Sequence, residues 1–166
     1  MFRGAPGCGK STFIDKHGLK KYALSADDIR LLCASPRMTA DGKWEISNSN
    51  DKVVWDMLFK LLEIRMNSGE FTVVDATNSK TVEMNRYSEL AKMYRYRVFI
   101  IDMTDIPIDE CKRRNRSRSA EKIVPEEAID KMYARFATQA IPGKIKVFCR
   151  FRCRKLLEER ALFISI

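Results

Sequence analysis

The sequence has little that would place it in a membrane. No run of about 18 uncharged apolar residues occurs, so we expect no transmembrane helix. The first residues also lack the apolar stretch of a secretory signal peptide. The single histidine, His17, falls near the expected end of a helix, where an imidazole is favourable without any further role. We therefore expect neither a membrane anchor nor histidine chemistry.

Cysteines are few and irregularly spaced. Their number is odd, and none forms a Cys-x-x-Cys pair: Cys8, Cys33, Cys111, Cys149 and Cys153. Disulfide frameworks and zinc sites need paired or regularly spaced cysteines. We therefore expect reduced thiols in a cytoplasmic protein.

Acidic residues are outnumbered by basic ones. The 166 residues include 31 Lys and Arg against 22 Asp and Glu, which gives a formal net charge of +9. This charge favours an anionic partner, above all a nucleic acid, although many basic proteins bind none. The length and the 45% hydrophobic content are those of one domain with a hydrophobic core.

Strands and helices are expected to alternate along the chain. The expected strands are 1–3, 22–24, 71–75, 96–102 and 144–148. The expected helices are 10–18, 25–34, 51–69, 83–94, 107–119 and one that starts at Pro125. Helix 25–34 has two candidate N-caps, Ser25 and Asp27, and helix 51–69 has an apolar stripe of Val54, Leu58, Leu61 and Leu62. The polar residues 35–50, which include Pro36 and Gly42, are expected to form a loop.

This order predicts an α/β fold, a doubly wound and mostly parallel five-stranded sheet flanked by helices. In such sheets the functional site lies at the carboxyl ends of the strands. We expect residues 1–148 to form the domain. Residues 149–166 are a basic tail, for which a nucleic-acid-binding strand, an edge strand and a partner-docking surface all stay open.

The stretch GAPGCGKST matches the pattern G-x-x-x-x-G-K-[ST] of phosphate-binding loops. Its glycines let backbone N–H groups turn toward phosphate oxygens. We expect Lys10 to bridge the transferred phosphoryl group and its neighbour, and the Ser11 hydroxyl to bind Mg²⁺. A chance glycine-rich turn is the weaker alternative, because strand, loop and helix follow in the right order. The expected nucleotide-binding residues are Gly4, Ala5, Pro6, Gly7, Cys8, Gly9, Lys10, Ser11 and Thr12.

A kinase that acts on hydroxyl groups needs a proton acceptor and cations near the phosphates. A GTPase is not expected, because no guanine-reading N-K-x-D follows the loop at a suitable distance. Asp27 and Arg30 are three residues apart at a helix start, so their side chains share one face. The Asp27 carboxylate is a candidate acceptor of a hydroxyl proton, and the Arg30 guanidinium is a candidate clamp on a substrate phosphate. A helix cap beside a solvated arginine is the alternative.

Two further motifs contain candidate site residues. In VVDATN, Asp75 ends a strand and is a candidate for the Mg²⁺ site. Thr77 and Asn78 follow it as candidate substrate-binding residues, with a plain turn as the alternative. In KRRNRSRS, Arg114 and Arg118 are four apart and are expected to share a helical face as a lid over a triphosphate, with a solvated basic face as the alternative.

Together these motifs resemble the 5′-polynucleotide kinases, in particular the kinase domain of the phage-type polynucleotide kinase–phosphatase and the related bacterial RNA-repair kinases. The resemblance rests on GAPGCGKST, DDIR, DATN and RRNRSRSAEKIVPEEAIDKMYARF, in this order between residues 4 and 148. It implies a P-loop kinase fold with a helical lid. It also implies an ATP-binding lysine at Lys10, a general base at Asp27, an acceptor-phosphate contact at Arg30, and a lid arginine at Arg118 assisted by Arg114.

The resemblance implies an ATP-dependent polynucleotide 5′-hydroxyl kinase that acts on the ends of RNA or DNA. Its cofactors would be ATP, or a related nucleotide such as GTP, and Mg²⁺. A ligase or a phosphatase of the same repair pathway would be a partner in function. The chain itself lacks the D-x-D-G-T strand of the phage-type phosphatase, so no phosphatase activity is expected. The alternatives are a small-molecule kinase acting on a nucleoside, sugar or antibiotic, and a nonenzymatic nucleotide-binding module.

Overall fold

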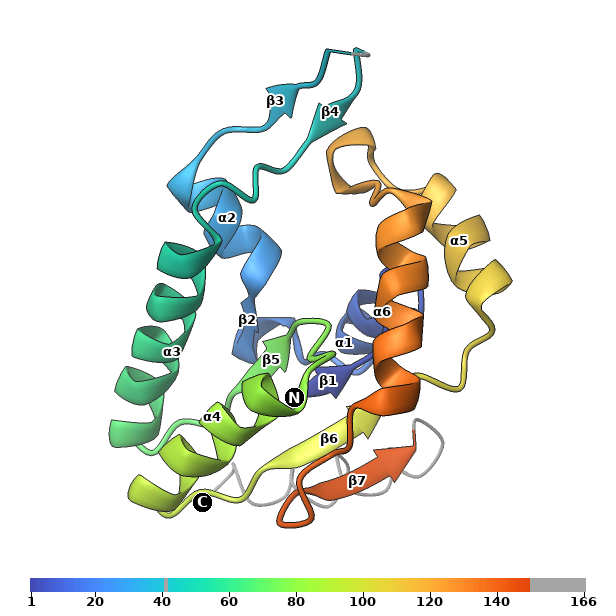
Figure 1. The fold of residues 1–166 in the computed structure, drawn as a ribbon. Coiled ribbons are helices and arrows are strands. Elements are labelled where there is room, and N and C mark those ends of the chain that lie inside the picture. Colours follow the sequence, from blue (N-terminus) through green and yellow to red (C-terminus); the bar gives the residue numbers. More distant parts are fainter. Residues whose placement is uncertain (41, 150–166) are drawn as a thin grey trace.

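The five expected strands are all present in the computed structural model, which describes residues 1–40 and 42–149. They lie in two parallel sheets, one of three strands and one of two, which are side by side between helices (Figure 1). Strand β2 pairs with β5, and β6 pairs with both β1 and β7, always in parallel. The strands are β1 (Phe2–Arg3), β2 (Ala23–Ser25), β5 (Val73–Asp75), β6 (Phe99–Asp102) and β7 (Lys146–Cys149).

The short strand β1 lies between β5 and β6, and side chains supply part of its attachment. Beyond its end, the Gly4 backbone N–H donates to the Thr77 carbonyl at 3.1 Å. The buried Asn78 side chain donates its Nδ2 to the Phe2 carbonyl at 2.6 Å. On the other side, the buried Arg3 guanidinium pairs with Asp102 at 3.3 Å. A strand of two residues is therefore held by a polar side chain on each side.

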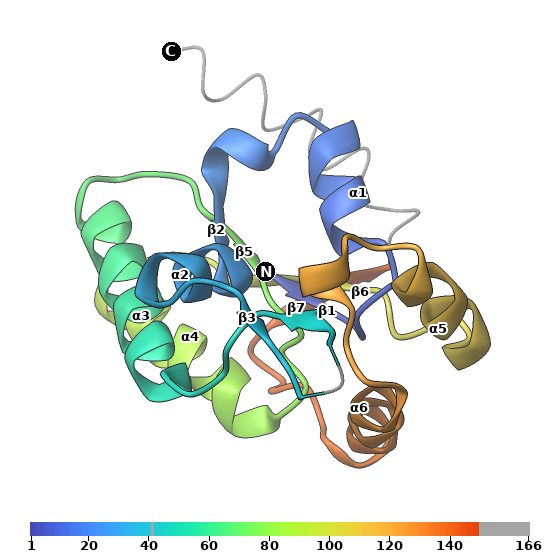
Figure 2. The same cartoon turned by 90° about the horizontal axis from the view of Figure 1, so that it is seen from above.

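Helices cover both faces of the strands. Helices α3 and α4 lie on one side, and α1, α5 and α6 lie on the other (Figures 1 and 2). The faces alternate along each strand, since Val74 packs with the α3 side and Val73 with the α1 side. The helices are α1 (Lys10–Lys16), α2 (Ala26–Cys33), α3 (Asp51–Asn67), α4 (Thr81–Met93), α5 (Ile108–Arg116) and α6 (Glu126–Thr138), with short 3₁₀ helices η1 (Lys20–Tyr22) and η2 (Ala120–Lys122).

Helix α3 confirms most of its expected apolar stripe and corrects one member. The buried positions are spaced by four residues, which places them on one face: Val54, Leu58, Leu62 and Met66. Leu61 is 37% exposed and does not belong to the stripe. It lies next to the buried face, and the four-residue spacing leaves it on the rim. In α2, Ser25 is the N-cap, because its Oγ accepts the Asp28 N–H at 3.3 Å.

Residues 35–50 are not a plain loop, and this expectation was wrong. They contain an antiparallel hairpin of β3 (Arg37–Met38) and β4 (Trp44–Glu45). Thr39 bonds Lys43 across the turn, and Arg37 pairs with Glu45 at 2.9 Å. Pro36 directly precedes β3, and Gly42 lies in the turn between the two strands, where its N–H donates to the Thr39 carbonyl at 2.9 Å. Residues that usually indicate a loop therefore belong to a hairpin here.

The hairpin reaches from the end of α2 to η2, the orange segment between α5 and α6 (Figures 1 and 2). The Ile46 backbone N–H donates to the Glu121 carbonyl at 3.1 Å. The segment that connects α2 to α3 is therefore joined to the segment that connects α5 to α6. No helix in the described part of the chain has the length and apolarity needed to cross a bilayer. The expected tail, residues 149–166, begins with Cys149, which ends β7, and its other residues lie outside the described part of the chain.

Candidate active site

The phosphate-binding loop runs from β1 into α1 and packs directly against α5. Gly7 has a φ of 81°, and a Cβ added there would lie 2.1 Å from the Cys111 carbonyl oxygen. Gly9, the residue before α1, has a φ of 99°. Both positions need glycine, the first for the close approach and both for their left-handed backbone. The loop and the helix that carries the arginines are thus in contact through backbone atoms.

Lys10 lies inside the curve of this loop. Its side chain is buried, and its Nζ donates to the carbonyls of Gly4 at 2.9 Å and Ala5 at 3.0 Å. These bonds satisfy a buried ammonium that would otherwise be costly. They also keep the positive charge at the loop, where the expected phosphate contact requires it.

Ser11 and Asp75, the two candidate Mg²⁺ residues, meet at the end of β5. The Ser11 hydroxyl donates to Asp75 Oδ2 at 3.0 Å. Burial raises the pKa of the Asp75 carboxyl, and the nearby Lys10 charge and the Ser11 hydrogen bond oppose this rise. The described residues contain no cluster of three His, Cys, Asp or Glu for a metal. This pair nevertheless fits Mg²⁺ bound with a nucleotide, because such an ion takes one or two protein ligands and completes its shell with phosphates and water.

Asp27 and Arg30 form the ion pair that their spacing predicts. Arg30 Nη1 donates to Asp27 Oδ1 at 2.8 Å, within the first turns of α2. A second carboxylate, Asp51 at the start of α3, accepts from Arg30 Nε at 2.8 Å. Sequence reasoning missed Asp51, because an acidic residue at a helix start indicates only a favourable helix dipole.

The Asp27–Arg30 pair lies close to the Ser11–Asp75 pair because β2 and β5 run side by side. Ser25, at the end of β2, pairs in register with Asp75, at the end of β5. Asp27 follows two residues later, and its charge, like that of Asp28, adds to the rise in the pKa of Asp75. The phosphate loop, Asp75 and Asp27 therefore meet at the carboxyl ends of the strands, as the doubly wound fold predicts.

Arg114 lies over the phosphate loop, with its Nη1 3.6 Å from the position of a Cβ added at Gly9. Glu110 holds it there through Nε at 2.6 Å. Hydrogen bonds from Arg113, and then from Arg114, lower the pKa of Glu110 to about 2. This carboxylate therefore stays charged and keeps both arginines paired at neutral pH.

Arg118 does not share a helical face with Arg114, which corrects the expectation. Helix α5 ends at Arg116, and Arg118 follows in the turn that its backbone N–H makes with the Asn115 carbonyl at 3.2 Å. The cause is Asn115, a fully buried residue that both donates to the Val124 carbonyl at 2.7 Å and accepts its N–H at 3.1 Å. These bonds fold the chain back over the end of α5. The role of Asn115 was not predicted, because an asparagine in a sequence usually indicates only a turn.

Asn78, like Asn115, has a structural role. Its side chain is 0% exposed and is bonded to Phe2, so it cannot touch a substrate as it stands, and this part of the prediction was wrong. Its φ of 45° is a left-handed conformation that asparagine tolerates. Thr77 is half-buried, and its carbonyl accepts the Gly4 N–H at the start of the phosphate loop.

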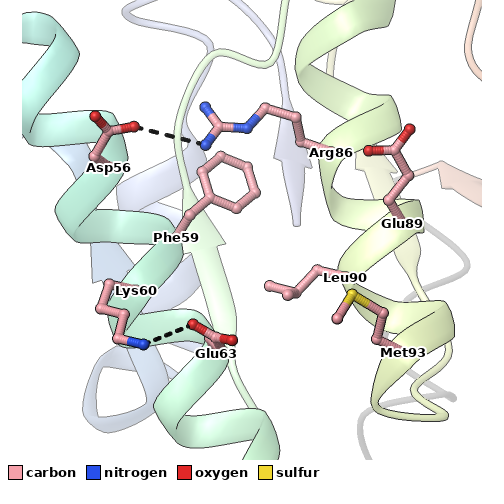
Figure 3. Close-up of a pocket in the computed structure, with 8 residues that line it drawn as sticks. All are labelled: Asp56, Phe59, Lys60, Glu63, Arg86, Glu89, Leu90 and Met93. Atoms are coloured by element: carbon pink, nitrogen blue, oxygen red, sulfur yellow. Dashed lines mark hydrogen bonds and ion pairs between the residues drawn. The ribbon is translucent and has the colours of Figure 1, made fainter.

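A groove of about 390 Å³ lies elsewhere, between α3 and α4 (Figure 3). None of the residues predicted for the site lines it. In Figure 3 the Arg86 guanidinium extends toward Asp56 on the facing helix and lies over the Phe59 ring, with its carbon 3.9 Å from the ring centre. The lining residues are Asp56, Phe59, Lys60, Glu63, Arg86, Glu89, Leu90 and Met93.

Comparison with known proteins agrees with this geometry. A search of the curated proteins finds no match. Among solved structures, the chain is similar to a protein from Chloroflexus aurantiacus described as a "putative kinase", with a TM-score of 0.63 at 13% identity over 97% of this chain and 95% of that one. The fold is thus the α/β fold of P-loop kinases. A family model described as AAA domain matches residues 1–139, which include the phosphate loop, the Ser11–Asp75 and Asp27–Arg30 pairs and the arginine segment. The chain belongs to this AAA domain family.

Proposed function

We propose that the protein is an ATP-dependent kinase that phosphorylates the 5′-hydroxyl end of RNA or DNA. The observation that carries this proposal is the Asp27–Arg30 ion pair, which lies at the strand ends beside the phosphate loop. A nucleotide-binding module has no need of a carboxylate held at this place. The solved structure described as a "putative kinase" supports phosphoryl transfer, and the net charge of +9 supports an anionic acceptor.

In this mechanism the acceptor hydroxyl oxygen forms a bond to the γ-phosphorus of ATP while the bond to the β-phosphate oxygen breaks and ADP leaves. Asp27 accepts the hydroxyl proton. Lys10 and Arg114 stabilise the charge that develops on the transferred group. Ser11 and Asp75 would hold Mg²⁺, which neutralises phosphate charge when it is bound.

Arg30 serves the acceptor in this proposal. Each of its terminal nitrogens carries two N–H groups, and the ion pairs with Asp27 and Asp51 engage one on each. The second N–H of each nitrogen suits the phosphodiester that follows the first nucleotide of the acceptor. The product end, a 5′-phosphate, is the group that a ligase requires, so we place a ligase or a phosphatase in the same repair pathway.

The acceptor is tested with labelled ATP and three classes of compound: 5′-hydroxyl oligonucleotides, nucleoside 3′-phosphates and bare nucleosides. We expect oligonucleotides to be phosphorylated best, and their KM to rise with salt with a slope of about 0.7 per neutralised phosphate. A preference for bare nucleosides or sugars with little salt dependence would instead establish a small-molecule kinase.

The role of Asp27 is tested by Asp27→Asn, with Asp28→Asn as its matched control. Both residues lie in the first turn of α2, but Asp27 is paired with Arg30, and the structure gives Asp28 no such pair among the described residues. We expect Asp27→Asn to lose turnover by about 10²-fold or more and to keep ATP affinity. Loss of ATP affinity would assign Asp27 to the nucleotide site, and equal effects of the two variants would refute its role as base.

A further inference from the structure

Arg30 is held from two directions by carboxylates of two different helices. Asp27, on its own helix α2, accepts from Nη1 at 2.8 Å. Asp51, the first residue of α3, accepts from Nε at 2.8 Å, and its Oδ1 also lies 2.8 Å from Nη2. The Arg30 side chain is only 13% exposed, while both carboxylates are almost half exposed. The arginine is therefore the fixed centre of the group, and the carboxylates lie at its solvent side.

The pairing with Asp51 fixes which edge of the guanidinium is available. Asp51 occupies the edge formed by Nε and Nη2, and Asp27 accepts from the other terminal nitrogen. A planar guanidinium that is bound along one edge loses rotation about its last bonds. Its distal N–H groups then have one direction in which to meet a further anion. Without Asp51, Arg30 would keep a single partner, three residues away on the same helix, and would turn about its side-chain bonds.

The same contact closes the base of the β3–β4 hairpin. The hairpin lies in the segment between the end of α2 at Cys33 and the start of α3 at Asp51. The Arg30–Asp51 pair joins the two helices just below these points, across 21 residues of sequence. The direction of the hairpin and the orientation of Arg30 therefore depend on the same ion pair.

We propose that Asp51 is a positioning residue. It orients Arg30, and Arg30 then holds both the Asp27 carboxylate and the phosphate of the incoming acceptor end. This inference rests on the proposed function. It assigns a role in specificity to a residue outside the phosphate loop and outside the Asp27–Arg30 motif.

The test is Asp51→Asn, which keeps the size of the side chain and removes its charge. Asp56→Asn is the matched control, because Asp56 lies on the same helix, is 62% exposed and pairs with Arg86 away from the site. We expect Asp51→Asn to raise the KM of a nucleoside 3′-phosphate on the order of 10-fold, since the neutral amide oxygen holds the Arg30 guanidinium more weakly than the carboxylate does. The KM of ATP should stay within about two-fold in both variants, and Asp56→Asn should change neither. Asp51→Glu keeps the charge one methylene further out and should give an intermediate KM.

A double-mutant cycle with Arg30→Ala separates positioning from a general effect on stability. If Asp51 acts through Arg30, Asp51→Asn in the Arg30→Ala background should cost less than about two-fold in kcat/KM. Additive losses in the cycle, or equal rises in the KM of ATP and of the acceptor, would overturn the inference. The cycle is measured on whichever acceptor the wild-type protein uses best. A preference for bare nucleosides would thus refute the proposed function and the phosphate contact of Arg30, while the coupling still decides whether Asp51 orients Arg30.

Discussion

Replacing Gly7 by alanine tests the contact between the phosphate loop and α5. The added Cβ would lie 2.1 Å from the Cys111 carbonyl oxygen and 2.9 Å from its carbon. Real Cβ atoms essentially never approach another atom within 3.0 Å. The neighbour is backbone in a helix, which cannot rotate away like a flexible side chain. The loop must therefore move away from α5, or the helix must shift.

The cost has two parts that can be separated. A left-handed backbone, φ 81° at Gly7, costs an alanine about 1–2 kcal/mol. Overpacking of a close contact costs about 1–3 kcal/mol more. The expected loss is about 2–5 kcal/mol of unfolding free energy, which lowers the Tm of a chain of this size by about 4–20 °C.

Gly69→Ala is the matched control, because Gly69 has a φ of 77° and nothing within 4 Å of an added Cβ. Urea unfolding of both variants should show that Gly69→Ala loses only the backbone part. Gly7→Ala should lose at least about 1 kcal/mol more, together with ATP affinity. Equal losses in the two variants would refute the close packing of the loop on α5.

Three further predictions concern the loop lysine and the arginine segment. Lys10→Ala should lower turnover by about 10²–10³-fold while the protein stays folded by circular dichroism; near-normal turnover would contradict the role of Lys10 at the phosphates. Asn115→Leu should leave the N–H and C=O of Val124 unpaired, so that urea unfolding shows a loss of about 2–4 kcal/mol and the Val124 amide exchanges faster; unchanged exchange would be the contrary result. The pKa of Glu110 is lowered in the folded protein, so its stabilising effect is full above about pH 4.5 and is lost as the pH falls toward 2. The difference in Tm between wild type and Glu110→Gln should shrink over that range, and a difference independent of pH would exclude the ion pairs with Arg113 and Arg114 as its cause.

The parts of the fold that the sequence predicted are those with a local signal. The phosphate loop is a continuous motif, and Asp27 and Arg30 are one helical turn apart, so their pairing follows from helix geometry alone. The strands that end at Ser25 and Asp75 are apolar runs followed by polar residues, which locates the carboxyl edge of the sheet.

The missed parts depend on contacts between residues that are far apart in the sequence. The β3–β4 hairpin has strands of two residues, too short for an alternating pattern, and its attachment is a backbone bond between Ile46 and Glu121. Asp51 becomes significant only through Arg30, which is 21 residues earlier. Helix α5 ends before Arg118 because the Asn115 side-chain amide hydrogen-bonds both the N–H and the C=O of Val124. A hydrophobic periodicity gives no sign of such a contact.

The backbone bond between Ile46 and Glu121 has a consequence for how the protein's motions are observed. It joins two connecting segments on opposite sides of the strand ends, and neither segment can move away from the other without breaking it. Once it breaks, the Ile46 amide proton is free to exchange with solvent. The exchange rate of this single proton therefore measures how often the two segments separate. If nucleotide or an acceptor end slows the exchange, the added compound holds the two segments together.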